Sequence, residues 1–209
     1  LYKSVYIGGY MITRKEMTHM LLKEGLLSCL ANNSFESVTV TSLCKASGIT
    51  RSTFYLHYSN IMEIVDDLVD DAIAYSKPGM VDNNNLQIIA NTLSAASNSV
   101  SLREAYDSIF DRLPLCQRII RHKKYLPLFL DEQISEYVLQ RIIGREKDRQ
   151  GLVIAESLGI SFDVGVSVFV FLVHGLYAVN KQYKWSQSDE WLEAQKIIFE
   201  LVYRGLQRR

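Results

Sequence analysis

The chain has 209 residues, of which 48% are hydrophobic and 22% charged, and its formal net charge is zero. These fractions are ordinary for a soluble globular protein, and only 3 prolines and 11 glycines leave little room for long loops or low-complexity linkers. The 3 cysteines have no short paired spacing, which excludes the usual zinc-finger patterns and gives no indication of a disulfide framework. We therefore expect free thiols in a reducing compartment, a cytoplasmic location, and no metal or other cofactor.

The first predicted helix follows a leader, residues 1–12, to which we assign no role. This helix runs from about residue 13 to residue 31, and its apolar positions follow the spacing of one helical face: Leu22, Leu26, Cys29 and Leu30.

The charges are unevenly distributed along this part of the chain. Residues 1–58 contain six Lys and Arg side chains against three acidic ones, whereas residues 59–80 contain five acidic side chains and one lysine. A basic segment 1–58 followed by an acidic segment 59–80 is consistent with a protein that binds phosphate groups only through its N-terminal part.

The segment 39–58 predicts two short helices joined by a tight turn. Thr39 and Thr50 are favourable N-caps, because their side-chain oxygens can accept the unpaired amide hydrogens of the helix that follows. Gly48 suits the turn, since glycine adopts positive φ at no steric cost. The expected helices cover residues 40–47 and 51–58.

The second of these helices has two different faces. Phe54 and Tyr58 lie four residues apart and share an apolar back. The opposite side carries hydrogen-bond donors and no acidic residue. A short helix that is apolar on one face and rich in hydrogen-bond donors on the other is typical of a recognition helix that binds in the DNA major groove.

The spacing from Cys44 through Gly48 to Phe54, and the string Arg-Ser-Thr-Phe-Tyr-Leu-His-Tyr, resemble the helix-turn-helix of the TetR family of transcriptional regulators. The resemblance covers residues 13–72; the rest of the chain matches only in length and helical character. It implies an all-α fold in which an N-terminal helix-turn-helix three-helix domain precedes a larger helical effector-binding and dimerisation domain. It also implies a ligand-responsive repressor that binds double-stranded operator DNA.

The same resemblance indicates which residues would contact DNA. Arg51 opens the second short helix, where a guanidinium can reach guanine acceptors or a phosphate. Thr41, Tyr55 and His57 match positions that donate to phosphates, and Thr53 matches one near the bases. Leu56 is apolar and can touch a thymine methyl group or contact nothing. The expected DNA-binding set is Thr41, Thr50, Arg51, Ser52, Thr53, Tyr55, Leu56 and His57.

Beyond the helix-turn-helix the periodicity stays helical. We predict a connecting helix within residues 59–77 and place a boundary at the proline, glycine and asparagine residues after it. The predicted domains are 13–58 for DNA binding and 78–209 for effector binding and dimerisation. In the latter, helices are expected near residues 86–97, 102–113, 115–122, 126–144, 152–158, 162–183 and 189–206. No segment shows convincing strand alternation.

Candidate effector contacts come from aromatic and titratable side chains of this second domain, although core packing explains any one of them. They are Tyr106, Phe110, Tyr125, Phe129, Phe169, His174 and Tyr177. The basic run from Arg118 to Lys124 is interpreted most simply as a solvated face, with a contact to an anionic effector as the alternative.

The last two predicted helices, 162–183 and 189–206, are apolar on more than one face, which predicts burial in a homodimer interface. The apolar run 164–173 is too short to span a bilayer, so no membrane contact is expected. No nucleophile or acid–base arrangement indicates an enzyme. One alternative stays open: a co-regulator of the same fold that acts through a partner protein, because Ile61 stands where relatives usually carry a lysine that pairs with a phosphate.

Overall fold

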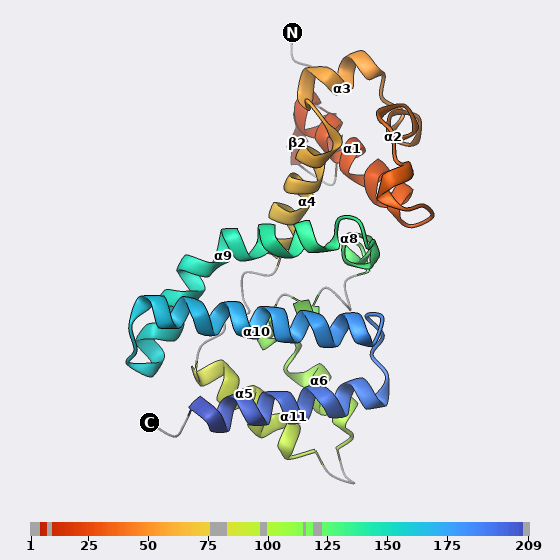
Figure 1. Ribbon diagram of the computed structural model, residues 1–209. Coiled ribbons are helices and arrows are strands. Elements are labelled where there is room, and N and C mark those ends of the chain that lie inside the picture. Colours follow the sequence, from red (N-terminus) through yellow and green to blue (C-terminus); the bar gives the residue numbers. More distant parts are fainter. Residues whose placement is uncertain are drawn as a thin grey trace. The chain divides into compact units, whose positions relative to one another are not determined.

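The computed structural model describes residues 5–7, 10–75, 83–96, 100–114, 116–118 and 123–206, which are largely helical (Figure 1). The longer helices are α1 (Arg14–Leu30), α4 (Ile61–Tyr75), α5 (Asn83–Ser94), α9 (Ser135–Leu158), α10 (Phe162–Gln182) and α11 (Asp189–Leu206). The shorter ones are α2 (Val40–Ser47), α3 (Arg51–His57), α6 (Leu102–Ser108) and α8 (Leu126–Leu130), with the 3-10 turns η1 (Phe35–Ser37) and η2 (Phe110–Arg112). The predicted all-α fold class is confirmed for the described residues from α1 onward.

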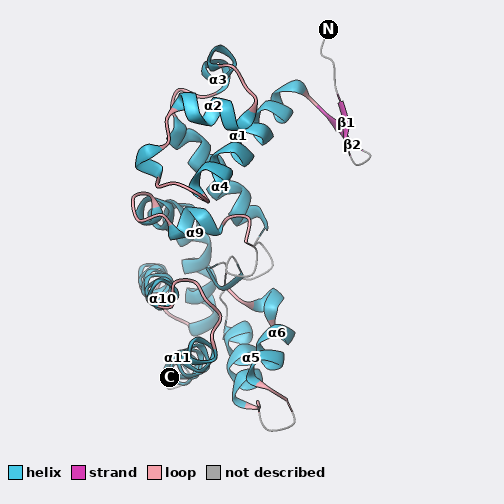
Figure 2. Cartoon of the chain, turned by 90° about the vertical axis from the view of Figure 1, so that its right-hand side faces the viewer, coloured by secondary structure: helices cyan, strands magenta, loops and turns pink. Residues whose placement is uncertain are grey.

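The leader contains a feature that the sequence did not predict. Strands β1 (Val5–Ile7) and β2 (Tyr10–Ile12) pair antiparallel ahead of α1 (Figure 2). Three residues per strand are too few for an alternating pattern to be recognised, but Val, Ile and Tyr are residues that favour strands.

The chain divides into two compact units. Unit 1 comprises residues 1–72 and 124–141, and unit 2 comprises residues 73–123 and 142–209. Polar contacts tie the inserted segment 124–141 into unit 1: Lys124 Nζ lies 2.7 Å from Glu24 Oε1, and the Phe35 amide donates to Asp131 Oδ2 at 2.7 Å. The predicted boundaries of the functional domains stay a prediction, but this insertion was not anticipated.

The core of unit 1 is formed where α1, α2, α3 and α4 meet. Its fully buried side chains include Leu22, Leu26, Leu43, Phe54 and Ile64. Helices α1 and α2 approach so closely that a Cβ on Gly25 would lie 2.0 Å from Ser47 Oγ. The predicted apolar face of the first helix is thus the one that packs on the helix-turn-helix.

In unit 2, α5, α6 and α11 pack together around Trp191, which is fully buried and whose ring meets that of Tyr106 at 5.2 Å. Helices α9 and α10 cross closely, because a Cβ on Gly165 would lie 2.3 Å from the Gly151 carbonyl oxygen. Only glycine fits at such a crossing without a shift of one helix.

Three predicted helix boundaries are corrected by the structure. The helix expected over 126–144 instead ends at Leu130, where Asp131 Oδ1 accepts hydrogen bonds from the amides of Gln133 and Ile134 and starts a new helix. That helix, α9, then runs without a break to residue 158, across the gap predicted between 144 and 152. The helix expected over 102–113 ends at Ser108 and continues as the turn η2. The helix expected over 115–122 lies largely outside the described residues.

Helix α10 is the most apolar element. Its length and a mean hydropathy of 1.9 over 18 residues would allow it to cross a membrane, and 28% of that window is buried inside the protein. An apolar core helix of a soluble protein has the same composition, so one such helix is weak support for a membrane span. The expectation of no membrane contact stays a prediction.

Candidate nucleic-acid interface

The helix-turn-helix of unit 1 is built as its sequence predicts. Thr39 Oγ1 accepts the Ser42 amide at 3.1 Å, and Ser42 Oγ accepts the Thr39 amide at 2.9 Å, which closes a capping box on α2. Gly48 ends α2 with φ 65° and ψ 25°. Thr50 then caps α3 by accepting the Thr53 amide at 3.2 Å. Local hydrogen bonds thus define where both short helices begin.

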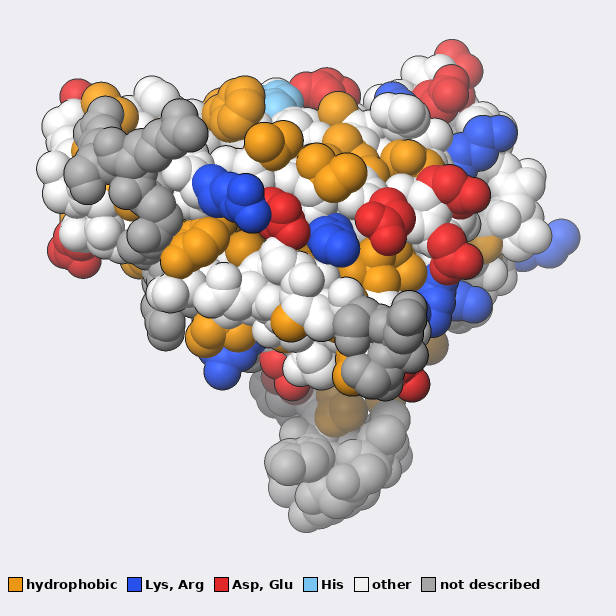
Figure 3. Space-filling model, turned by 90° about the horizontal axis from the view of Figure 1, so that it is seen from below, with side chains coloured by type: hydrophobic (Ala, Val, Ile, Leu, Met, Phe, Trp, Pro, Cys, Tyr) orange, Lys and Arg blue, Asp and Glu red, His pale blue; other side chains and the backbone are white. Residues whose placement is uncertain are grey.

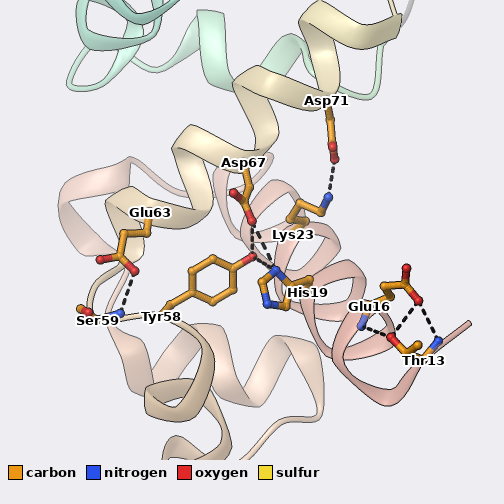
Figure 4. A network of polar contacts seen from close by, with 9 residues as sticks. All are labelled: Thr13, Glu16, His19, Lys23, Tyr58, Ser59, Glu63, Asp67 and Asp71. Atoms are coloured by element: carbon orange, nitrogen blue, oxygen red, sulfur yellow. Dashed lines mark hydrogen bonds and ion pairs between the residues drawn. The ribbon is translucent and has the colours of Figure 1, made fainter. Parts of the chain in front are cut away.

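The back of α3 is anchored in the core. Phe54 is 0% and Tyr58 5% exposed. The Tyr58 hydroxyl donates to Asp67 Oδ2 of α4 at 2.5 Å and lies 2.8 Å from His19 Nδ1 of α1 (Figure 4). Burial, followed by the hydrogen bond and the negative charge of Asp67, raises the pKa of Tyr58, so this hydroxyl stays a donor.

A second pair links the same two helices, because Lys23 Nζ of α1 lies 2.5 Å from Asp71 Oδ2 of α4 (Figure 4). The Tyr58–His19–Asp67 contacts and this ion pair hold α1, the end of α3 and α4 in one arrangement. Sequence reasoning assigned Tyr58 only to the core. The acidic face of α4 was the available signal for these contacts, but its partners became visible only in three dimensions.

The front of α3 is open to solvent. Of the predicted DNA-binding set, the structure leaves these residues exposed: Thr41, Thr50, Arg51, Ser52, Tyr55 and Leu56. Thr53 is half-buried and its Oγ1 lies 2.9 Å from that of Thr50, so part of its hydrogen-bonding capacity is used locally. The front of α3 therefore carries one cation and several hydroxyl donors, with no acidic residue on the helix.

His57 stands apart from the other predicted contacts. It is half-buried, and its ring meets that of His19 edge-on with 5.2 Å between centroids. Burial, with smaller contributions from His19 and Lys15, lowers the pKa of His57 below the ordinary 6.5. The ring is therefore neutral in the free protein at neutral pH.

The seven predicted effector residues do not come together in one unit. Tyr125 and Phe129 belong to unit 1, whereas the other five belong to unit 2: Tyr106, Phe110, Phe169, His174 and Tyr177. Tyr106 and Phe169 are buried core side chains, and His174 is half-buried.

A groove of about 440 Å³ in unit 2 has a different lining. It lies between α10 and α11, and the side chains around it are apolar: Leu86, Pro114, Phe171, Leu172, Leu176, Val179, Ile198, Phe199, Leu201 and Val202, with Gly175. Sequence reasoning placed most of these residues in a dimer interface and none in an effector site.

The interpretation of Arg118 as part of a solvated face is wrong, because only 3% of this residue is exposed. Buried amides lie beside it along the chain. Gln117 accepts from Tyr106 Oη at 3.1 Å and donates to Gln195 Oε1 at 2.9 Å. Such a layer of buried polar side chains could not be read from periodicity, because glutamine is usually an exposed residue. Across the described parts of the chain, no cluster of three or more His, Cys, Asp or Glu side chains is suited to hold a metal ion.

These features define an all-α protein that presents a helix-turn-helix from one of its units. No protein-family model and no curated protein matches the sequence. Among solved structures, the chain is similar to the crystal structure of the TetR family repressor AlkX from Dietzia sp. strain DQ12-45-1b, which is implicated in biodegradation of n-alkanes. The identity is 13%, the match covers 91% of this chain and 95% of that one, and the TM-score is 0.41.

Proposed function

We propose that this protein is a sequence-specific DNA-binding transcriptional regulator, a homodimer that represses transcription until a small molecule binds it. The observation that carries the proposal is the two-sided α3. Phe54 and Tyr58 fix its back in the core, so that the exposed Arg51 and Tyr55 are presented on a rigid support. An α-helix fits the major groove, where arginine donates to guanine and hydroxyl groups reach phosphates.

The proposed dimer forms through α10 and α11. Phe171 on α10 is 72% exposed and Leu201 on α11 is 66% exposed, and both line the apolar groove between these helices. Figure 3 shows this end of the molecule from below, where hydrophobic side chains are interspersed among Lys, Arg, Asp and Glu. Two helices from each copy would pack about a two-fold axis as a four-helix bundle and cover this apolar surface.

Dimerisation would also couple unit 2 to DNA binding. Two recognition helices fit successive major grooves only when they are about 34–36 Å apart. A ligand that binds more tightly to a dimer in which the recognition helices have another spacing shifts the population toward that dimer. The affinity for operator DNA then falls, at most by the ratio of the ligand's affinities for the two dimer conformations.

Replacing Arg51 or Tyr55 by alanine tests the recognition helix. Both side chains are exposed, so the free energy of unfolding should change by no more than about 0.5 kcal/mol for Arg51→Ala and by about 1 kcal/mol for Tyr55→Ala, which loses a ring contact with Phe54. The binding free energy for operator DNA should weaken by about 1–3 kcal/mol if Arg51 reads a base. The measurement is a fluorescence anisotropy titration with the upstream DNA of the gene, and Arg103→Ala, an exposed arginine of unit 2, is the control. Unaltered binding by both α3 variants would rule out this helix as the reader.

The lowered pKa of His57 predicts that DNA affinity rises as the pH falls. A phosphate beside the ring favours its charged form, so the complex would bind more protons than the free protein. Affinity should therefore increase from about pH 8 to about pH 6, and level off below the pKa of His57 in the free protein. His57→Gln should flatten this dependence, whereas His174→Gln in unit 2 should not. A slope that His57→Gln leaves intact would show that His57 does not contact a phosphate.

A second candidate function is that of a co-regulator that acts through a partner protein. Leu56, near the C-terminal end of α3, is 82% exposed, and α4 begins with Ile61 rather than a cation. Apolar surface in this position suits a protein partner better than a phosphate. The anisotropy titration separates the two functions, because a co-regulator would show no specific binding of DNA on its own.

A further inference from the structure

Arg118 places two guanidinium nitrogens in the protein interior without a hydrogen-bond partner. It is 3% exposed, and its Nε and Nη2 atoms are buried without a hydrogen bond. No carboxylate of a described residue lies within ion-pair distance of it. An ion removed from water without a counter-charge costs several kcal/mol, so this arrangement is unfavourable unless an anion completes it.

The charges around Arg118 do not supply that anion. Burial lowers the pKa of Arg118, and Asp111 of η2 and Tyr75 at the end of α4 oppose this only at a distance. Asp111 is exposed, and Tyr75 is 48% exposed. The guanidinium therefore keeps its positive charge in a poorly solvated environment.

Other buried donors of unit 2 also lack an acceptor. Gln195 is 0% exposed and accepts from Gln117, but its Nε2 has no partner, and neither does the buried Nε2 of Gln187. Buried N–H groups without acceptors are uncommon in folded proteins. Together with the two nitrogens of Arg118, these donors of unit 2 would be satisfied by acceptor oxygens.

We infer that unit 2 binds a small organic oxyanion, a carboxylate or a phosphate group, on the guanidinium of Arg118. The planar guanidinium presents two parallel N–H groups that match two oxygens of such an anion. This inference rests on the part of the proposed function that assigns effector binding to unit 2, and it names the chemical class of the effector.

Thermal unfolding of the full-length protein tests the inference, with acetate, benzoate and inorganic phosphate as probes and chloride at equal ionic strength as the reference. The protein is first dialysed against the chloride buffer. The melting temperature should rise with the concentration of at least one probe, because a ligand that binds only the folded state stabilises it. Comparison of the three probes distinguishes a carboxylate from a phosphate site.

Variants of Arg118 should change the melting temperature in a predicted direction. Arg118→Met keeps the length of the side chain and removes the buried charge, so in chloride it should melt at a higher temperature than the unchanged protein and no longer respond to the probe. Arg118→Lys keeps the charge but loses the two parallel N–H groups of the guanidinium, so the probe should raise its melting temperature by less. Arg112→Met, which removes an exposed arginine of the same unit, should leave the response unchanged.

Two results would overturn the inference. If Arg118→Met melts at a lower temperature in chloride or fails to fold, Arg118 is a structural residue. If its response to the probe equals that of the unchanged protein, the anion binds elsewhere. A DNA titration separates this result from the proposed function, since loss of anion binding with intact DNA binding refutes only the inference. Anion binding without DNA binding refutes only the proposal that the protein is a DNA-binding regulator.

Discussion

Phe54→Ala is expected to lower the free energy of unfolding by about 3–5 kcal/mol, the range observed when a buried aromatic ring is truncated. Phe54 is 0% exposed, and its ring packs against those of Tyr55 and Tyr58 at 5.1 and 6.3 Å between centroids. The cavity would lie under α3, in a protein whose total stability is of the order of 5–15 kcal/mol. The variant should therefore lose DNA binding together with stability.

Urea denaturation followed by circular dichroism measures this loss. Tyr55→Ala is the matched control: the neighbouring ring is 53% exposed, and its removal, which loses the edge-on contact with Phe54, should change the free energy of unfolding by about 1 kcal/mol. The two variants distinguish a residue that supports α3 from one that contacts DNA. Phe54→Ala should lower both stability and DNA affinity, whereas Tyr55→Ala should lower mainly DNA affinity. A loss below about 1 kcal/mol for Phe54→Ala would mean that α3 does not depend on this core contact.

Glutamate at both Phe171 and Leu201 is expected to convert the protein to a monomer and abolish operator binding. Both residues are largely exposed within one chain, so the double variant should keep its fold. In a two-fold symmetric interface it would bury four unpaired carboxylates, and each costs several kcal/mol. At micromolar concentration the association equilibrium should then lie on the side of the monomer.

Light scattering after size-exclusion chromatography measures the mass, and circular dichroism confirms the fold. Leu152→Glu on α9 is the control, because Leu152 is a 49% exposed leucine of the same unit outside α10 and α11. If the folded double variant remained a dimer with normal DNA affinity, the interface would have to lie on other helices.

The helix-turn-helix could be predicted from its residues because its limits are defined by neighbours in the chain. Thr39 and Thr50 cap helices that begin at the next residue, and Gly48 ends α2 with the positive φ for which glycine is suited. The split of α3 into a buried back and an exposed front follows from the spacing of Phe54 and Tyr58. The roles of the exposed residues in DNA binding stay predictions.

Other boundaries depended on partners far away in the chain. Gly151 does not interrupt α9, because it lies where α10 crosses, with Gly165 against its carbonyl oxygen. Residues 126–130 form a separate short helix, and the Asp131 carboxylate after it accepts the amides of Gln133 and Ile134 in the turn before α9 and also the amide of Phe35. A glycine or an aspartate in the sequence does not indicate whether a distant residue will pack against it. The continuity of α9 across Gly151 and the break at Asp131 were therefore not predicted.

The sequence by itself determined the all-helical class, the two short helices with their turn, and the apolar character of α10 and α11, because capping, backbone preference and periodicity act within a few residues. The tertiary structure alone decided that residues 124–141 pack in unit 1, that Tyr58 meets Asp67 and His19, and that Arg118 is buried. Burial and pairing depend on side chains that folding brings together from distant positions, and a polar residue does not indicate from its own identity whether water or protein will surround it.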